Sequence, residues 1–273
     1  MMLLNRHLGI KGPTVKKLIE MKNSPQLRNE LLHSEPKALA IWDTLEEFKD
    51  TLKHSPLMKP KAVWRFFKTF SDGNTLHIDL NSENGGSFKK EIIFEFPRQT
   101  AGDKLCLSDF SDPSFEVKDN LALFVVTVGE GVREAAEEFK NSGDYLKSHI
   151  LQALALESAE GYAELLHSQI RRMWGFPDSP DTTMLERFQA KYRGKRYSFG
   201  YPACPALSDQ RKLFQALQPE TIGIELTEGD MMEPEASVSA MVFHHPQACY
   251  FSVNSEALTS EIPDLSVKFP QPH

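Results

Sequence analysis

The chain has 273 residues and a formal net charge of -7, and 40% of its residues are hydrophobic while 25% are charged. This composition is ordinary for globular proteins and argues against disorder of the whole chain. The acidic balance argues against a protein that binds nucleic acid through a basic face.

The three cysteines, Cys106, Cys204 and Cys249, are far apart and form no CxxC pair. A disulfide framework or a zinc site built on thiolates is therefore not expected. The longest apolar run, Leu121 to Val126, is too short to cross a bilayer, and the N-terminus lacks the long apolar stretch of a secretion signal. We therefore expect a cytoplasmic protein with no membrane or nucleic-acid partner.

The first 58 residues are expected to form a helical lead-in. Apolar residues recur there at spacings of three and four, the pattern of an amphipathic helix. These residues are Leu39, Ile41, Trp42, Leu45, Phe48 and Leu52. Prolines divide the region into segments, because proline breaks the helical hydrogen-bond ladder. They are Pro13, Pro25, Pro36 and Pro56.

The next region has the pattern of an antiparallel meander. Strands are expected over residues 62–67, 76–80 and 91–96, and residues 76–80 alternate between apolar and polar side chains. Turn residues separate the strands at Ser71–Asn74 and Gly85–Ser87. These connections are too short for helical crossovers, so neighbouring strands must run antiparallel.

The remainder of the chain mixes helices with strands. Residues 120–129 form a near-continuous apolar run, which is typical of a buried strand. Helices are expected over residues 131–141, 145–173, 182–192 and 209–217. Further strands are expected over residues 222–226 and 238–243, with residues 250–253 completing a second hairpin. Residues 254–273 contain three prolines and are expected to form a loose tail.

Several motifs have both a functional and a structural interpretation. Gly129-Glu130-Gly131 lies between a strand and a helix, but neither a phosphate-loop nor a dinucleotide-binding motif is complete, which favours a tight turn. His244 and His245 are adjacent and point to different sides of a strand, so they are poorly placed to bind one metal ion. His167, on the long helix, is interpreted as structural.

Nucleophilic catalysis has little support in the sequence. No GxSxG elbow is present, and nothing in the spacing assigns a histidine base to Ser198 or Cys204.

The segment from Lys191 to Pro205 (KYRGKRYSFGYPACP) is the most unusual in the chain. It combines four cations within six residues with a Gly-Tyr-Pro-Ala-Cys-Pro turn, which is rigid at the prolines and permissive at Gly200. Guanidinium groups bind carboxylates through two hydrogen bonds. The segment is therefore either a binding site for a small molecule with a carboxylate or a solvated basic loop with a structural turn.

Together with other stretches, this segment resembles the C-terminal activation domain of cobalamin-dependent methionine synthase. The stretch RGKRYSFGYPACP resembles the signature Arg-x-x-x-Gly-Tyr-Pro-Ala-Cys-Pro of that family. The other matching stretches, in the same order as in the family, are KPKAVWRFF at 59–67, LCLSDF at 105–110, DNLALFVVTVGEG at 119–131, a Leu-His-x-x-x-Arg helix with Trp174-Gly175, and LTEGDMMEPEASVSAMVFHHP at 226–246.

The resemblance implies a fold, a ligand and partners. The fold would be a C-shaped α+β domain around a bent antiparallel sheet with long flanking helices. The domain would bind S-adenosylmethionine and support the reductive methylation of cob(II)alamin to methylcobalamin. The cobalamin would be held by another domain of the synthase, and the electron would come from a flavodoxin- or ferredoxin-type donor. The chain would therefore be part of a methyltransferase and would not turn over alone.

The resemblance also implies site residues. Asp109 would bind the α-ammonium group of the ligand, and Arg196 would bind its α-carboxylate. The backbone of the signature turn would cradle the ligand, through Gly200, Tyr201, Pro202 and Ala203. Tyr201 would also contact the cobalamin domain, and Glu164 would help to receive the displaced cobalt-ligating histidine.

The sequence departs from the family at two acidic positions. Some members have glutamates where this chain has Ser168 and Ala190, and these would stabilise the sulfonium cation. Backbone carbonyls or other acids, such as Asp230 or Glu233, are candidates to replace them. The departures also support an alternative function, a non-catalytic binding or assembly module for another corrinoid methyltransferase.

The expected organisation is a lead-in over residues 1–58, the activation domain over 59–253 and a tail over 254–273. The chain is either a fragment of a larger synthase or a stand-alone activation protein.

Overall fold

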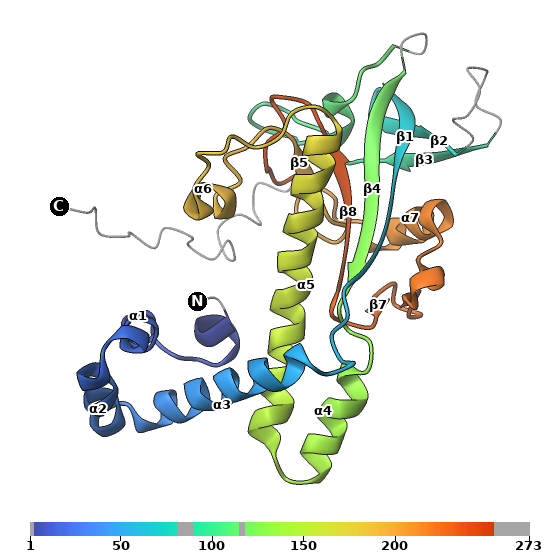
Figure 1. Cartoon of the computed structure of the whole chain (residues 1–273). Helices are drawn as coiled ribbons and strands as arrows, with labels where there is room; N and C mark the ends of the chain where they lie inside the picture. Colours follow the sequence, from blue (N-terminus) through green and yellow to red (C-terminus); the bar gives the residue numbers. More distant parts are fainter. Residues whose placement is uncertain (1–2, 81–89, 115–117, 254–273) are drawn as a thin grey trace. The chain divides into compact units, whose positions relative to one another are not determined.

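The computed structural model describes residues 3–80, 90–114 and 118–253, and its elements are shown in Figure 1. Contacts divide the chain into two compact units, each built from three segments. The first unit comprises Met1–Val63, Val125–Leu166 and Gln218–Val238. The second unit comprises Trp64–Phe124, His167–Leu217 and Ser239–His273. The expected turn at residues 85–87 and the expected tail at 254–273 lie outside the described residues.

The first unit is mainly helical, and the helices predicted in its N-terminal part are confirmed. Its helices include η1 (Leu3–His7), α1 (Gly12–Glu20), η2 (Met21–Asn23), α2 (Pro25–Ser34), α3 (Pro36–Lys53), α4 (Val132–Asn141) and η5 (Pro219–Ile222). Pro13, Pro25 and Pro36 each lie in the first turn of a helix, where proline removes no helical hydrogen bond.

The long helix α5 (Tyr145–Met173) begins in the first unit and contributes to its core. Apolar side chains from the N-terminal helices pack with Ile150 and Ala153 of α5. The helical members of this cluster include Val15, Leu18, Leu31, Leu39, Trp42 and Leu45. The short strands β6 (Glu225–Leu226) and β7 (Met232–Glu233) pair antiparallel in the same unit.

A six-stranded sheet has the order β3-β2-β1-β4-β8-β5, and most of its residues belong to the second unit. Its strands are β1 (Lys61–Asp72), β2 (Thr75–Asp79), β3 (Glu91–Glu95), β4 (Asp119–Thr127), β5 (Lys195–Tyr197) and β8 (Ser237–Phe243). The predicted meander is confirmed, because β1 and β2 pair antiparallel with Phe70 opposite His77, and β2 and β3 pair with His77 opposite Ile93. The α+β class is confirmed as well.

The second unit also contains η3 (Leu107–Phe110), α6 (Met184–Phe188), η4 (Leu207–Asp209) and α7 (Gln210–Leu217). The helix predicted over residues 182–192 is shorter than expected. α6 begins after Thr183, which forms a capping box with Glu186. The helix cannot continue through Ala190, because this residue has a positive φ of 51°.

Two strand predictions need correction. Residues 250–253 form no strand, and residues 222–226 contribute only the two-residue strand β6. The place beside β8 is taken by β5 from the basic segment, so the expected second hairpin does not form. The chain near residue 250 is instead held by single hydrogen bonds, from Tyr197 Oη to the Cys249 carbonyl (2.6 Å) and from the Val253 N–H to the Pro202 carbonyl (3.1 Å).

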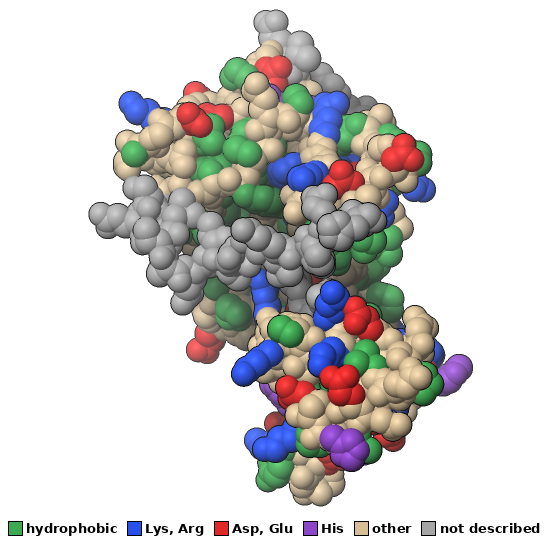
Figure 2. Space-filling view, turned by 90° about the vertical axis from the view of Figure 1, so that its left-hand side faces the viewer, with side chains coloured by type: hydrophobic (Ala, Val, Ile, Leu, Met, Phe, Trp, Pro, Cys, Tyr) green, Lys and Arg blue, Asp and Glu red, His purple; other side chains and the backbone are tan. Residues whose placement is uncertain are grey.

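On the face drawn in Figure 2, basic and acidic side chains are interspersed among the described residues. None of the described helices has the length and apolar character that crossing a membrane requires.

The Gly129–Gly131 segment is the tight strand-to-helix turn that the sequence favours. Gly131 has a φ of 73° at the N-cap of α4, a conformation that glycine adopts without strain. The Val132 N–H donates to the Gly129 carbonyl at 3.1 Å. Gly129 also lies so close to Pro234 that a side chain would not fit between them.

Two glycine substitutions should therefore change stability in opposite directions. In Gly129→Ala, the new Cβ would overlap the Pro234 ring, and overpacking of this kind costs about 1–3 kcal/mol. In Gly161→Ala, a Cβ in the middle of α5 meets no described atom within 4 Å, so removing a helical glycine should stabilise by up to about 1 kcal/mol. Urea denaturation measures both. Equal effects would contradict the close approach of Gly129 to Pro234.

Candidate functional site

The predicted binding residues of the basic segment lie on one short strand and the turn that follows it, all in the second unit. Strand β5 pairs antiparallel with β8, and Arg196 lies opposite Val242. The Arg196 side chain is half-buried. The sequence left two interpretations of this segment open, and its incorporation into the sheet excludes a loop that is solvated throughout.

Backbone hydrogen bonds hold the turn from Gly200 to Cys204 in one conformation. The Gly200 N–H donates to the Cys204 carbonyl, and the Cys204 N–H donates to the Tyr201 carbonyl, both at 2.8 Å. Gly200 has a φ of 81°, and a Cβ there would lie 3.3 Å from Leu207 Cδ1. The turn therefore requires glycine for both its conformation and its packing.

The turn exposes some of its groups and leaves two backbone groups of Ala203 without a partner among the described residues. Tyr201 is 61% exposed and Pro202 is also exposed, whereas Ala203 and Cys204 are buried. Among the described residues, the N–H and carbonyl of Ala203 have no hydrogen-bond partner. Buried backbone groups are nearly always paired, so the N–H and the carbonyl of Ala203 are candidates to bind polar groups of a ligand.

Cys204 is not a nucleophile in this turn. Burial raises the pKa of its thiol to about 12, so the thiol remains protonated at neutral pH. This agrees with the absence of support for nucleophilic catalysis in the sequence.

The structure brings the segments that carry Asp109 and Arg196 together through the aromatic residues next to them. The ring of Phe110 stacks on the ring of Tyr197, with 6.1 Å between centroids, and both rings contact Phe243 of β8 edge to face. The side chain of Tyr197 is buried and fixes this arrangement, since its hydroxyl donates to the Cys249 carbonyl.

The carboxylate of Asp109 already has partners. Arg98 donates two hydrogen bonds to it, both at 2.7 Å, and the Cys106 N–H donates a third at 2.8 Å. Burial raises the pKa of Asp109, but these hydrogen bonds outweigh burial and hold the pKa below its usual range. A ligand ammonium group would have to compete with Arg98 for this carboxylate.

Glu164 belongs to the first unit, unlike the other predicted site residues. It lies on α5 and is half-buried. Of the acids considered as replacements at the sulfonium, Glu233 forms an ion pair with Arg133, and Asp230 has a φ of 64° in the connection between β6 and β7.

A buried polar cluster in the second unit was not assigned a function from the sequence. It consists of His167, Arg171, Asp178, Tyr192 and Lys195. Arg171 and His167 are both 0% exposed. Arg171 donates to both carboxylate oxygens of Asp178 at 2.7 Å, and its guanidinium lies 3.7 Å from the centroid of the Tyr192 ring. Only the Leu-His-x-x-x-Arg pattern could have indicated this cluster, because Asp178 and Tyr192 follow it without a recognisable motif.

His244 has a carboxylate partner. Its Nε2 lies 2.6 Å from Asp119 Oδ1. Burial raises the pKa of Asp119, but hydrogen bonds from His244 and two backbone N–H groups hold it below its usual range. Within the described ranges, no group of three or more histidine, cysteine, aspartate or glutamate side chains is arranged to bind a metal ion.

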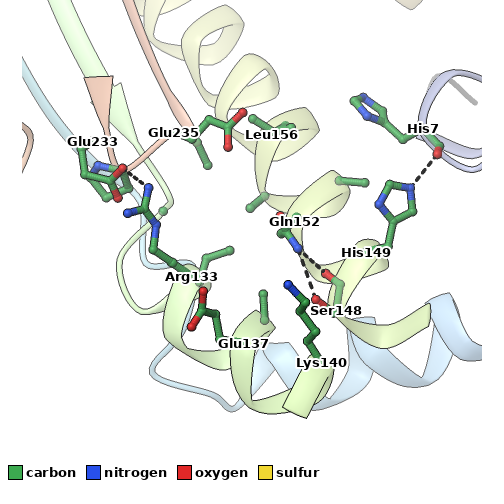
Figure 3. A pocket seen from close by; sticks show the side chains of 17 residues that line it. His7, Arg133, Glu137, Lys140, Ser148, His149, Gln152, Leu156, Glu233 and Glu235 are labelled. Atoms are coloured by element: carbon green, nitrogen blue, oxygen red, sulfur yellow. Dashed lines mark hydrogen bonds and ion pairs between the residues drawn. The ribbon is translucent and has the colours of Figure 1, made fainter. Parts of the chain in front are cut away.

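A cavity of about 420 Å³ lies in the first unit, between α4, α5 and the loop after β7 (Figure 3). Ion pairs and hydrogen bonds occupy much of its polar lining. They include Arg133 with Glu233, His149 with the His7 carbonyl, and Gln152 with Ser148. None of the ligand-binding residues predicted in the second unit lines it.

The family model described as "Vitamin B12 dependent methionine synthase, activation domain" matches residues 19–259. The chain belongs to this family. The resemblance seen in the sequence is thereby confirmed, and the relatives of this activation domain are methionine synthases.

Two curated relatives are named methionine synthase. The protein of Mycobacterium tuberculosis is 32% identical over 262 residues, and that of Mycobacterium leprae is 31% identical over 258 residues. Each match covers 90% of this chain but only 20% of the relative. The chain therefore spans about a fifth of the length of the curated relatives it matches.

A solved structure has the same fold. It is described as the crystal structure of the MetH reactivation domain bound to AdoHcy (S-adenosylhomocysteine). The TM-score is 0.72 at 28% sequence identity, and the match covers 82% of this chain and 71% of the other.

Removing the partner of the buried arginine should destabilise the activation domain. Asp178→Asn would remove the carboxylate that accepts two hydrogen bonds from the fully buried Arg171, and breaking a buried ion pair costs about 3 kcal/mol. The exposed Asp181, whose side chain has no partner among the described residues, offers the matched control Asp181→Asn, with almost no expected effect. Denaturant unfolding measures both.

The destabilisation should depend on pH in a defined direction. Hydrogen bonds from Arg171 hold the pKa of Asp178 below its usual range. A lowered pKa stabilises the folded state above the unfolded pKa of about 4, and this stabilisation is lost as the pH falls through the folded value. The difference in the free energy of unfolding between the original chain and Asp178→Asn should therefore become smaller as the pH falls. A difference that stays constant down to pH 2 would contradict the ion pair.

Proposed function

We propose that this chain binds S-adenosylmethionine and presents its methyl group to a cobalamin held by another domain of a methionine synthase. The observation that carries the proposal is the fold shared with a reactivation domain whose structure contains S-adenosylhomocysteine, the product that S-adenosylmethionine leaves after methyl transfer. The hydrogen-bonded signature turn, in which the N–H and the carbonyl of Ala203 have no partner among the described residues, supports a ligand at the same place in this chain.

The residues fit a zwitterionic ligand of this kind. Arg196 would bind the α-carboxylate, and the turn from Gly200 to Ala203 would cradle the remainder of the ligand through its backbone. Asp109 would bind the α-ammonium group. This group would have to displace the guanidinium of Arg98, which forms an ion pair with the Asp109 carboxylate. Residues 59–253 would form the activation domain, with residues 1–58 as its lead-in.

The proposed contribution of the chain is positioning. Cobalamin, bound by its own domain and reduced by one electron, would supply the nucleophile for the methyl group. Holding the sulfonium methyl in a fixed position makes this transfer effectively unimolecular. The exposed ring of Tyr201 would contact the cobalamin domain, and Glu164 would help to receive the histidine displaced from cobalt.

Further partners and the location follow from the same proposal. The electron would come from a flavodoxin- or ferredoxin-type donor in the cytoplasm. The contact with the cobalamin domain would be weak for a separate chain, because it lacks the high effective concentration that a linker provides. The contact would also be transient, since the cobalamin domain must reach its other substrates.

Two arginines of the basic segment should contribute very differently to binding. Arg196→Ala should weaken binding of S-adenosylmethionine by about 1.5–3 kcal/mol, the scale of hydrogen bonds to charged groups. Arg193 is exposed, donates from Nε to the His244 carbonyl and lies over the Phe176 ring, so Arg193→Ala should weaken binding much less. Calorimetric titration measures both. Equal losses would mean that the segment acts only as a diffuse positive field.

The functional test needs the partner domain. The chain alone should make no methionine. It should produce methylcobalamin when it is mixed with S-adenosylmethionine, a reductant and a cobalamin-loaded synthase fragment that lacks its C-terminal domain, and visible absorption follows this product. Equally fast formation without the chain, or with Asp109 and Arg196 both replaced, would show that the proposed function is wrong.

A further inference from the structure

The side chain of Gln99 joins two segments that are far apart in the sequence. Its Oε1 accepts a hydrogen bond from the Leu105 N–H at 3.0 Å, and its Nε2 donates to the Ser252 carbonyl at 2.8 Å. One partner is a donor and the other is an acceptor, so only one orientation of the carboxamide satisfies both. Gln99 therefore bridges the loop before Asp109 and the last described residues of the chain.

On one side, the bridge leads to the Asp109 carboxylate through two adjacent backbone N–H groups. Gln99 binds this loop twice, because its own backbone N–H also donates to the Leu105 carbonyl at 2.9 Å. The next N–H along the chain, that of Cys106, donates to Asp109 Oδ2 at 2.8 Å. This contact is made by the backbone and not by Arg98. The position of the Asp109 carboxylate is therefore tied to that of Gln99.

On the other side, the bridge leads to the signature turn through a single peptide unit. The Ser252 carbonyl and the Val253 N–H belong to the same planar peptide, and this N–H donates to the Pro202 carbonyl at 3.1 Å. The Pro202 carbonyl in turn shares a peptide with the N–H of Ala203, which has no partner among the described residues. Hydrogen bonds in such a chain polarise one another, so the Ala203 N–H becomes a stronger donor.

The two ends of this chain of hydrogen bonds belong to two parts of the proposed binding site. Asp109 would bind the α-ammonium group, whereas the turn, which keeps its shape through internal hydrogen bonds, would cradle the remainder of the ligand. Ring packing between Phe110 and Phe251 joins the same two segments, but hydrogen bonds are more directional and fix a distance more closely. The Gln99 bridge therefore sets the separation that a ligand contacting both parts must fit.

We propose that Gln99 is a positioning residue, which holds the Asp109 carboxylate at a fixed distance from the signature turn. This inference rests on the proposed function. Gln99, Leu105 and Ser252 all lie outside the helices and strands, so regular secondary structure does not maintain this separation.

A change at the end of the side chain separates the two hydrogen bonds. In Gln99→Glu, the carboxylate still accepts from the Leu105 N–H, but it has no proton to donate and faces the Ser252 carbonyl, another acceptor. This variant should weaken binding of S-adenosylmethionine about tenfold in a calorimetric titration. The matched control Gln215→Glu introduces the same charge on an exposed side chain of α7 that has no partner among the described residues, and it should leave the affinity unchanged.

A double-mutant cycle shows whether Gln99 acts through Asp109. Asp109→Asn removes the charge that would pair with the ammonium group but keeps an oxygen for the Cys106 N–H. Without that ion pair the separation no longer matters, so Gln99→Glu should weaken binding much less in the Asp109→Asn chain than in the original one. A purely structural role of Gln99 would give the same fold-change in both chains, and equal losses would overturn the inference.

A spectroscopic measurement without ligand tests the chain of hydrogen bonds itself. In ¹⁵N-labelled Gln99→Glu, the backbone amide signals of Val253 and Ala203 should shift relative to the original chain, although both residues are far from Gln99 in the sequence. Signals that stay in place, or an unchanged affinity for S-adenosylmethionine, would overturn the inference while leaving the proposed function intact. Failure of the original chain to bind S-adenosylmethionine would overturn the proposed function, and this inference with it.

Discussion

The pairing of β5 with β8 is the interaction on which the candidate site depends. Three residues, Lys195 to Tyr197, attach the basic segment to the edge of the sheet. The alternation of side chains along a strand then separates Arg196 from its neighbour Tyr197, whose ring enters the aromatic core with Phe110 and Phe243. The turn that begins at Gly200 follows directly, so the position of the strand determines where the turn lies.

Elements with a strong local pattern were predictable from the sequence. Residues 145–173 form one helix and residues 61–95 contain the meander, because periodicity and turn residues are properties of neighbouring positions. The strand predicted at residues 250–253 was wrong because strand pairing depends on segments that are distant in the sequence. Its local pattern is suitable, but the edge of β8 is occupied by β5, and such competition between distant segments leaves no trace in the local sequence.

The candidate site was predictable only in part. The signature turn is contiguous, and its residues lie together in the structure as expected. The ion pair between Arg98 and Asp109, and the placement of Asp178 and Tyr192 around Arg171, join residues whose types are common and whose spacing follows no motif. Such contacts are created by tertiary packing. The motif comparison therefore assigned a ligand ammonium group to Asp109 without identifying Arg98, which already forms an ion pair with the Asp109 carboxylate.

We expect one binding site for S-adenosylmethionine, at the signature turn, and a titration of the ¹⁵N-labelled chain with this ligand locates it. Backbone amide signals of Arg196 and of the segment from Gly200 to Cys204 should shift in a saturable manner, with those of Ala203 among the most affected. The absence of any saturable shift at millimolar ligand, or shifts confined to residues of the cavity between α4 and α5, would contradict a binding site at this turn.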